Sequence, residues 1–223
     1  MKLLSTFAVA LTAKRKKEEF KRFQSYVTYV AKEDPAHVNL IIKTLAEKYS
    51  SSRQLALMMD CEKNPVILPG NEEKCSSWVK KNPEKAGCVR PYKLGSEPVI
   101  TNVWNRLRLV SNIQGIGEDV GNPFIQQEIN HYSNLIYPIG LLFVYNGNHS
   151  ANAAILKDEG EITPTGVIDW RILYEEDDLF FDGICFQSKL GNDVSIYEHL
   201  SEEIGLMFEA GRIVYTAEKE KKL

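Results

Sequence analysis

Residues 140–155, Gly140-Leu-Leu-Phe-Val-Tyr-Asn-Gly-Asn-His-Ser-Ala-Asn-Ala-Ala-Ile155, decide the expected fold. An apolar run of strand length, from Ile139 to Tyr145, ends at an Asn-Gly turn and is followed by helix-forming residues. A continuous apolar run is typical of a central strand that is covered on both faces. Gly147 adopts a positive φ at no steric cost, so the chain can turn sharply there. The stretch predicts a buried strand, a turn and a helix.

The turn between this strand and helix is a candidate anion-binding site. The first N–H groups of a helix have no partner within the helix, and they lie at its positive dipole end. We expect Asn148 or Ser150 to cap the helix by accepting from one of these groups. Asn146, Gly147, Asn148 and Ser150 are therefore candidate residues for holding a phosphate.

The turn also resembles a known signature. Gly147-Asn148-His149-Ser150-Ala151-Asn152-Ala153 is similar to the G-x-[HR]-R-x-x-A motif of the ParB/sulfiredoxin-like superfamily, in which a strand leads into a helix. DGQHR-type proteins of bacterial DNA-modification systems are similar at the same turn. The resemblance implies a mixed sheet with flanking helices and a loop that binds a nucleoside triphosphate. Some members hydrolyse the nucleotide, and some act on DNA or couple nucleotide binding to DNA partners.

The sequence departs from that signature at one position. Ser150 stands where the superfamily has arginine, the side chain best suited to pair with phosphate. Tight triphosphate binding then requires another cation, and Arg106, Arg108 and Arg171 are the candidates.

Two histidines are candidate catalytic residues. His149 lies at the head of the predicted helix, next to the carboxyl end of a strand, where open α/β sheets place ligands. It is a candidate general base, metal ligand or phosphate partner; alternatively, it only hydrogen-bonds the turn. His131 lies late in a helix predicted to begin at Asn122-Pro123, from where it either converges with His149 or lies on the surface.

Two carboxylates follow the motif in the chain. Asp169 and Asp182 fall in the next two predicted strands, and with His149 they would form a His/Asp site for a divalent metal such as Mg²⁺. Carboxylates are so frequent in this part of the chain that the coincidence also arises by chance.

The composition is that of an ordinary globular protein: 223 residues, a net charge of -3, 43% hydrophobic and 26% charged residues. It excludes collagen-like, coiled-coil, mucin-like and wholly disordered chains. Residues 158–209 hold fourteen acidic residues against two basic ones, whereas residues 1–157 carry a net positive charge. This asymmetry either attracts polyanions to one face or lets the two halves complement each other within the fold.

We expect three segments along the chain. Residues 1–60 read as a helical subdomain, with one helix before Asp34-Pro35 and a second that is capped by Asp34. Residues 50–52 break the second helix, and a short third helix is expected over Leu55–Met59. Residues 61–98 read as an irregular connection, with one strand near Val66–Leu68 and a short helix near Ser76–Lys81. Residues 99–223 read as a mixed α/β domain that carries the site.

Further elements are expected in the third segment. A strand over Val103–Val110 would place Arg106 and Arg108 on one face, beside Trp104. Other predicted elements are strands over Val167–Tyr174 and Leu179–Phe186, an acidic turn at residues 175–178 between them, and a C-terminal helix from Val194 to near Gly211.

The N-terminus imitates a short secretory signal, but the basic run Lys14-Arg15-Lys16-Lys17 follows its apolar stretch, whereas a signal peptide has its basic residues first. We therefore favour a first amphipathic helix in a cytoplasmic protein without a membrane span over an exported protein. The cysteines contain no C-x-x-C pair, which favours reduced thiols over a zinc site. One disulfide within Cys61–Cys88 is the alternative if the protein is exported.

Two functions are compatible with these features. The first is binding of a nucleotide or nucleic-acid phosphate at the turn, with phosphohydrolase or nuclease activity if the site is catalytic and Arg106 and Arg108 as electrostatic clamps. The second is a non-enzymatic interaction protein of a phage, plasmid or defence system, which has a degenerate nucleotide site and docks a protein partner.

Overall fold

A computed structural model describes residues 2–59 and 66–221 of the chain. Its first elements are two long helices, α1 (Lys2–Glu33) and α2 (Val38–Met58), joined by the short 3₁₀ helix η1 (Pro35–His37). The helices expected before residue 60 are thus present. The predicted break at residues 50–52 is wrong, because α2 runs through them. Serine is only mildly unfavourable in a helix, so the tertiary packing of α2 outweighs it.

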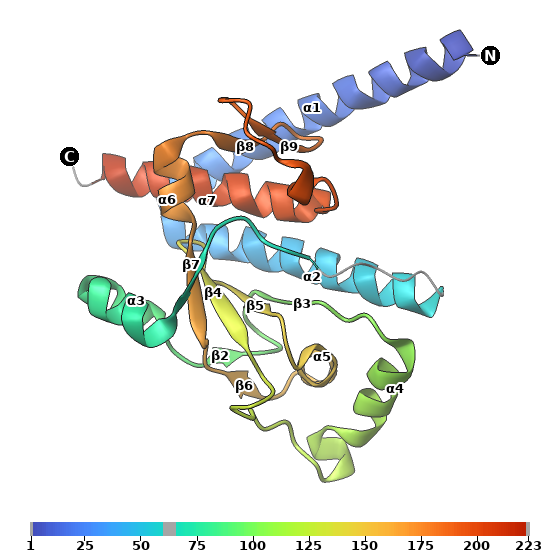
Figure 1. The fold of residues 1–223 in the computed structure, drawn as a ribbon, viewed down its shortest axis with the longest axis vertical. Helices are drawn as coiled ribbons and strands as arrows, with labels where there is room; N and C mark the ends of the chain where they lie inside the picture. The colour runs from blue at the N-terminus through green and yellow to red at the C-terminus, as the bar shows by residue number, and fades with distance from the viewer. Residues whose placement is uncertain (1, 60–65, 222–223) are drawn as a thin grey trace.

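A five-stranded mixed sheet lies at the centre of the protein, with the strand order β1-β7-β4-β5-β3 (Figure 1). Its strands are β1 (Glu72–Lys74), β3 (Val99–Thr101), β4 (Ser133–Tyr137), β5 (Leu141–Val144) and β7 (Gly166–Asp169). β4 pairs antiparallel with β5 and parallel with β7, and β5 pairs parallel with β3. The expected fold class, N-terminal helices followed by a mixed sheet with flanking helices, is confirmed.

Shorter elements surround this sheet. The remaining helices are α3 (Cys75–Lys81), α4 (Arg106–Gly115), α5 (Asn148–Leu156), α6 (Trp170–Glu176) and α7 (Glu202–Glu220), with 3₁₀ helices η2 (Pro83–Cys88), η3 (Glu118–Val120) and η4 (Ser195–Tyr197). Two-stranded ladders join β2 (Tyr92–Lys93) to β6 (Glu161–Ile162) and β8 (Leu179–Phe181) to β9 (Phe186–Ser188).

The sheet separates two apolar cores. Leu141 and Phe143 of β5 pack in a core that includes residues of α1, α2 and α7. Leu142 and Val144 pack in the other, which includes residues of α3 and α5. This alternation is that of a strand covered on both faces, as the sequence predicts for this stretch. The first two helices share their core with the sheet and the C-terminal helix.

The predicted strand over Val103–Val110 is wrong, because the chain enters α4 at Arg106. Asn105 is the N-cap of α4, and its side chain accepts the N–H of Arg108 at 2.9 Å. This cap satisfies one of the free N–H groups at the helix start, and it outweighs the alternating apolar pattern.

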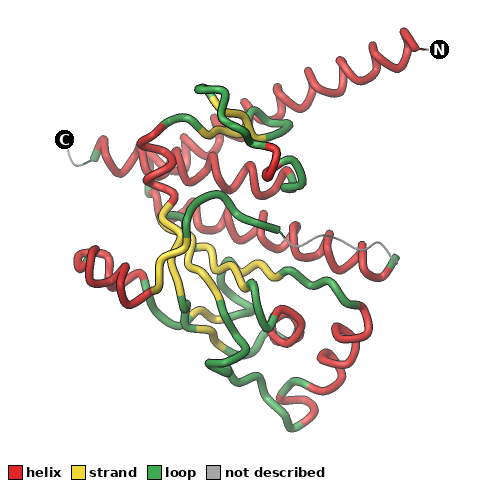
Figure 2. The backbone as a smooth tube through the Cα atoms, in the orientation of Figure 1, coloured by secondary structure: helices red, strands yellow, loops and turns green. Residues whose placement is uncertain are grey.

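The helix predicted to begin at residue 122 is also wrong, because an irregular loop leads from there to β4 (Figure 2). The N–H of Phe124 donates to the carboxylate of Glu159 at 2.9 Å, and the N–H of Gln127 donates to Nδ1 of His131 at 2.7 Å. Side chains thus bind the backbone groups that a helix would use internally.

The strand predicted over Val167–Tyr174 is shorter than expected. β7 ends at Asp169, whose carboxylate accepts the N–H of Arg171 at 3.1 Å and so caps α6. A capping aspartate at this point starts a helix in a segment whose apolar pattern indicated a longer strand.

The strand predicted over Leu179–Phe186 is a hairpin of β8 and β9. Its turn lies at Asp182, whose carboxylate accepts the N–H groups of Ile184 at 2.9 Å and Cys185 at 3.1 Å. The acidic residues 175–178, expected to form the connecting turn, instead lie at the end of α6 and just after it.

The C-terminal helix α7 begins eight residues later than expected and continues past Gly211 to Glu220. Gly211 does not end the helix. A Cβ at this position would lie 2.3 Å from the hydroxyl oxygen of Tyr174, so the glycine lets α6 and α7 approach closely.

The connecting segment is more regular than predicted, because its described residues 66–98 form β1, α3, η2 and β2. The short helix expected near Ser76–Lys81 is confirmed as α3. Residues 66–68 are not a strand. Cys61 lies outside the described residues. Cys75, Cys88 and Cys185 are free thiols, each half-buried. In residues 2–59 and 66–221, no helix is both long and apolar enough to span a bilayer.

Candidate functional site

The turn between β5 and α5 has the predicted backbone geometry. Gly147 has φ 73° and ψ 21°, in the left-handed region, and α5 begins directly after it. A Cβ on Gly147 would lie 2.3 Å from Cδ2 of His131, which is too close for two carbon atoms. Both the backbone conformation and this steric contact therefore favour glycine here.

The predicted capping of α5 by Asn148 or Ser150 is wrong, because both side chains bind elsewhere and no side chain caps the helix. Asn148 accepts the N–H of Asn102 at 2.7 Å and donates to the carbonyl of Tyr145 at 3.0 Å. Ser150 donates to the carbonyl of Gly147 at 2.9 Å. Among the described residues, the N–H groups of the first turn therefore have no side-chain acceptor.

A polar pocket of about 220 Å³ lies over this turn. The turn contributes Tyr145, Asn146, Gly147, Asn148, His149 and Ser150; the β3–α4 connection and α4 contribute Trp104, Arg108 and Asn112, and the loop before β4 contributes Asn130. All four predicted turn residues thus line one pocket. None of these ten lining residues is acidic, so an anion there would meet no carboxylate in the pocket wall.

Arg108 is the cation of this pocket. Its guanidinium carbon lies 5.2 Å from the ring centroid of Trp104, which also lines the pocket. Arg106, expected beside it, lines a neighbouring cavity of about 720 Å³ instead. The reason is the helix: residues two apart point in nearly opposite directions on a helix, but to the same side on a strand. Arg171 is ion-paired with Asp169.

His149 ties the start of α4 to the start of α5. Its Nε2 accepts the N–H of Asn105 at 3.0 Å and lies 3.4 Å from the nitrogen of Trp104. Burial, and next the charge of Arg108, lower the pKa of His149 below its usual 6.5, which keeps the ring neutral at pH 7. Because Nε2 accepts, the ring proton lies on Nδ1, which donates to no residue in the described part of the chain. Nε2 is thus engaged and has no free lone pair for a ligand.

His131 supports the turn from the other side. Its Nδ1 accepts the N–H of Gln127, so its Nε2 carries the proton and donates to Oγ of Ser150 at 2.8 Å. Ser150 in turn donates to Gly147, which makes a chain of hydrogen bonds into the turn. Burial lowers the pKa of His131. Both histidines therefore lie at the turn. Both ring nitrogens of His131 are already hydrogen-bonded within the protein, so neither is free to act as a base.

The two predicted metal carboxylates lie elsewhere. Asp169 pairs with Tyr137 at one end of β4, whereas the turn follows Val144, which pairs with Ser133 at the other end. At roughly 3.3 Å per residue, about 13 Å of strand separates them. Asp182 is in the β8–β9 hairpin, ion-paired at 3.0 Å with Lys17.

A metal site therefore does not fit these residues. Throughout residues 2–59 and 66–221, no three His, Cys, Asp or Glu side chains are grouped so that they could hold a metal ion. The Nε2 of His149 accepts a backbone N–H, and the ten residues that line its pocket include no carboxylate.

Four lining residues had no sequence prediction as site residues: Trp104, Asn112, Asn130 and Tyr145. One signal could have found the first two. Asn105 is one of the residue types favoured at an N-cap, and a helix starting there puts Arg108 and Asn112 on one face. Asn130 gave no such signal, because an irregular loop brings it to the pocket.

Comparison with known proteins places the chain in one family. A family model described as a family of unknown function (DUF6710) matches residues 9–221. The matched range includes every residue that lines the polar pocket. No curated protein and no solved structure matches the chain.

Proposed function

The chain belongs to this family of unknown function, DUF6710, and we propose that it binds a phosphate group of a nucleotide or nucleic acid in the polar pocket at the β5–α5 turn. One observation carries the proposal: Arg108 and the uncapped first turn of α5 line the same pocket, and none of its lining residues is acidic. The likeness of the turn to the ParB/sulfiredoxin-like signature supports it.

Each group has a separate part in binding. Arg108 supplies the positive charge that the superfamily arginine supplies at the position of Ser150, but it does so from α4. The N–H groups of α5 donate to phosphate oxygens at the positive end of the helix dipole. The Nδ1–H of His149 adds a neutral donor. The amides of Asn112, Asn130 and Asn146 supply further donors around the rim.

The proposal is for binding without hydrolysis by these histidines. A general base needs a free lone pair within reach of its proton donor. On His149 the Nε2 lone pair already accepts from Asn105, and on His131 the Nδ1 lone pair accepts from Gln127. We include a cytoplasmic location in the proposal, since free thiols such as Cys75 and Cys88 persist in reducing compartments.

Thermal unfolding tests the proposal. The protein is mixed with inorganic phosphate, nucleoside triphosphates with and without Mg²⁺, or oligonucleotides, and Tm is measured over a concentration series. A ligand that binds only the folded state raises Tm, by an amount that grows with its concentration. The proposal requires such a rise, and requires Arg108→Met to reduce it. An unchanged Tm with every compound, or an equal rise in Arg108→Met, contradicts it.

A further inference from the structure

Building on the proposed function, we infer that the ligand is a single-stranded nucleic acid, with one backbone phosphate in the polar pocket and neighbouring bases on exposed aromatic rings at its rim. The inference rests on the size of the pocket, on the aromatic residues that flank it and on the charge that it holds.

The pocket is too small to enclose a whole nucleotide. Its volume is about 220 Å³, whereas pockets that bury most of a small molecule have volumes of roughly 300–1,000 Å³. A ligand that places a single phosphate inside, and leaves the rest on the surface, fits this volume. A polynucleotide has that form, since its phosphates project from a chain that continues on both sides.

Aromatic rings flank the pocket on two elements. Trp104, from the β3–α4 connection, is 45% exposed, and Tyr145, from the β5–α5 turn, is 38% exposed; both line the pocket. Tyr145 stacks on Tyr132, which is also exposed, with ring centroids 6.2 Å apart and planes 17° apart. Exposed rings beside a phosphate-binding cation are the arrangement on which single-stranded bases stack.

The orientation of Trp104 is set before any ligand binds. Arg108 lies over the ring, and His149 meets it at an interplanar angle of 74° with centroids 5.4 Å apart. His149 is itself held by the N–H of Asn105. A ring whose position is already set loses little conformational freedom when a base stacks on it, which favours binding.

Single strands fit this surface better than duplexes do. In a duplex the faces of the bases are covered by their neighbours and cannot stack on side chains. Duplex binding also relies on neutralising many phosphates, whereas Arg108 is the one cation among the lining residues of this pocket.

Intrinsic fluorescence provides a direct test, because Trp104 is exposed while Trp78 and Trp170 are 2% and 0% exposed. The protein is titrated with dTMP, dT2, dT5 and dT15, with the matching uridine series, and with a 15-base-pair duplex. We expect the longer single strands to quench the emission of Trp104 and to bind at least tenfold more tightly than the mononucleotide. Trp104→Phe, which keeps a stacking ring, should abolish the quenching but retain most of the affinity measured by anisotropy.

Two alanine variants separate stacking from phosphate binding. Trp104→Ala and Tyr145→Ala should each weaken dT15 binding roughly 5- to 150-fold, which is the range for loss of one stacked base. The Tm rise with inorganic phosphate should fall less in either variant than in Arg108→Met, because that ligand offers no base to stack on the rings. Tyr29→Ala removes an exposed ring from α1 and should change neither result. Circular dichroism and Tm in the absence of ligand establish that each variant is folded.

Several outcomes overturn the inference and leave the proposed function standing. These are equal affinity for dTMP and dT15, tighter binding of the duplex than of either single strand, or binding of phosphoserine peptides in preference to oligonucleotides. If no phosphate compound binds, both the inference and the proposed function fail. Tighter binding of the thymidine or the uridine series identifies DNA or RNA as the preferred strand and supports the inference in either case.

Discussion

The backbone N–H of Asn105 donates to Nε2 of His149, 44 positions later in the chain, across 3.0 Å and so joins the starts of α4 and α5. α4 carries Arg108 and α5 begins at the Gly147 turn, so this hydrogen bond sets how the cation lies relative to the turn. It exists only while the histidine is neutral, because a protonated ring has no acceptor.

Acidification should therefore lower the free energy of unfolding of the protein. The pKa values of His131 and His149 are lowered from 6.5 by burial, so below about pH 6.5 the unfolded chain binds more protons than the folded one. Their contribution to the free energy of unfolding is complete above that pH and is lost as pH falls towards the lowered values. Urea unfolding at pH 7.5, 6.5 and 5.5 measures it. His149→Gln keeps an acceptor without this titration and should show a smaller loss; an identical loss contradicts the assignment.

Gly147→Ala should destabilise the protein more than Gly121→Ala does. Both glycines have positive φ, 73° and 70°, so alanine costs about 1–2 kcal/mol of backbone strain at either. At Gly121 a Cβ meets nothing within 4 Å, but at Gly147 it meets the ring of His131 and the carbonyl of Asn130. We expect a loss of roughly 2–4 kcal/mol at Gly147. Urea unfolding compares the two variants. Equal losses of unfolding free energy would show that the His131 ring moves aside without cost and would contradict this prediction.

Arg108→Met should weaken phosphate binding, whereas Arg106→Met should have little effect. A hydrogen bond to a charged group is worth about 1.5–3 kcal/mol, or roughly 10- to 150-fold in affinity. Both arginines are on α4, but only Arg108 lines the polar pocket. Arg108→Lys should restore part of the affinity, because lysine keeps the charge and loses the planar fork. Calorimetric titration with the ligand found by thermal unfolding measures these differences; equal losses at both positions would point to a general charge effect.

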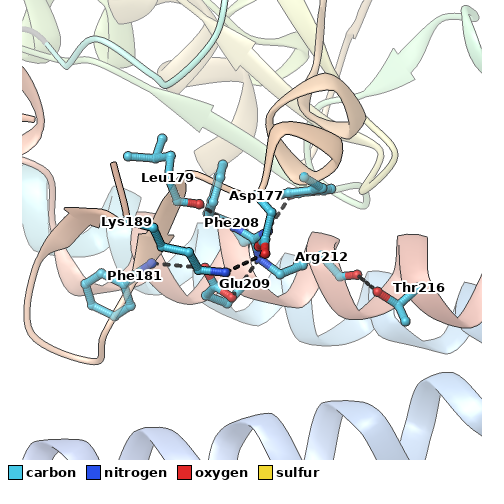
Figure 3. A network of polar contacts seen from close by, with 9 residues as sticks. Asp177, Leu179, Phe181, Lys189, Phe208, Glu209, Arg212 and Thr216 are labelled. Carbon is cyan, nitrogen blue, oxygen red and sulfur yellow. Dashed lines mark hydrogen bonds and ion pairs between the residues drawn. The ribbon is translucent and has the colours of Figure 1, made fainter. Parts of the chain in front are cut away.

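Arg212→Met should destabilise the protein strongly. Glu209 is buried on α7 and accepts from the N–H of Phe181 at 3.0 Å and from Nε of Arg212 at 3.2 Å (Figure 3). Arg212 also donates to the carbonyl of Leu179, and this hydrogen bond links α7 to the β8–β9 hairpin. Removing one partner of a buried ion pair costs about 3–5 kcal/mol, because the other charge stays buried.

The matched control is Glu209→Gln, which keeps an acceptor for the N–H of Phe181 and leaves Arg212 paired with Asp177 at 3.3 Å, so its cost should be smaller. Burial raises the pKa of Glu209 even in the presence of Arg212, so the folded state binds more protons than the unfolded one above pH 4.5. Without Arg212 this effect grows. The deficit of Arg212→Met measured by urea unfolding should therefore be smaller at pH 5 than at pH 7, and a deficit that does not depend on pH would contradict the role of Glu209.

Predictions from sequence succeeded where one short segment supplies every interaction that matters. Asp34 caps η1 by accepting the N–H of Ala36, two residues away, and the β5 strand and Gly147 turn follow from local pattern and backbone freedom. They failed where a polar side chain competes for the backbone. Asn105 and Asp169 start helices in segments whose apolar alternation is typical of strands.

The sequence by itself determined the strand, the left-handed glycine and the helix start at the candidate site, because these depend on residues within about fifteen positions of one another. Only the tertiary structure decided which other residues share that site. Arg108 reaches the pocket and Asp169 does not, since helix phase and strand register place side chains over distances that local pattern does not encode. The roles of the two histidines were decided in the same way, by backbone N–H groups that folding brings to their rings.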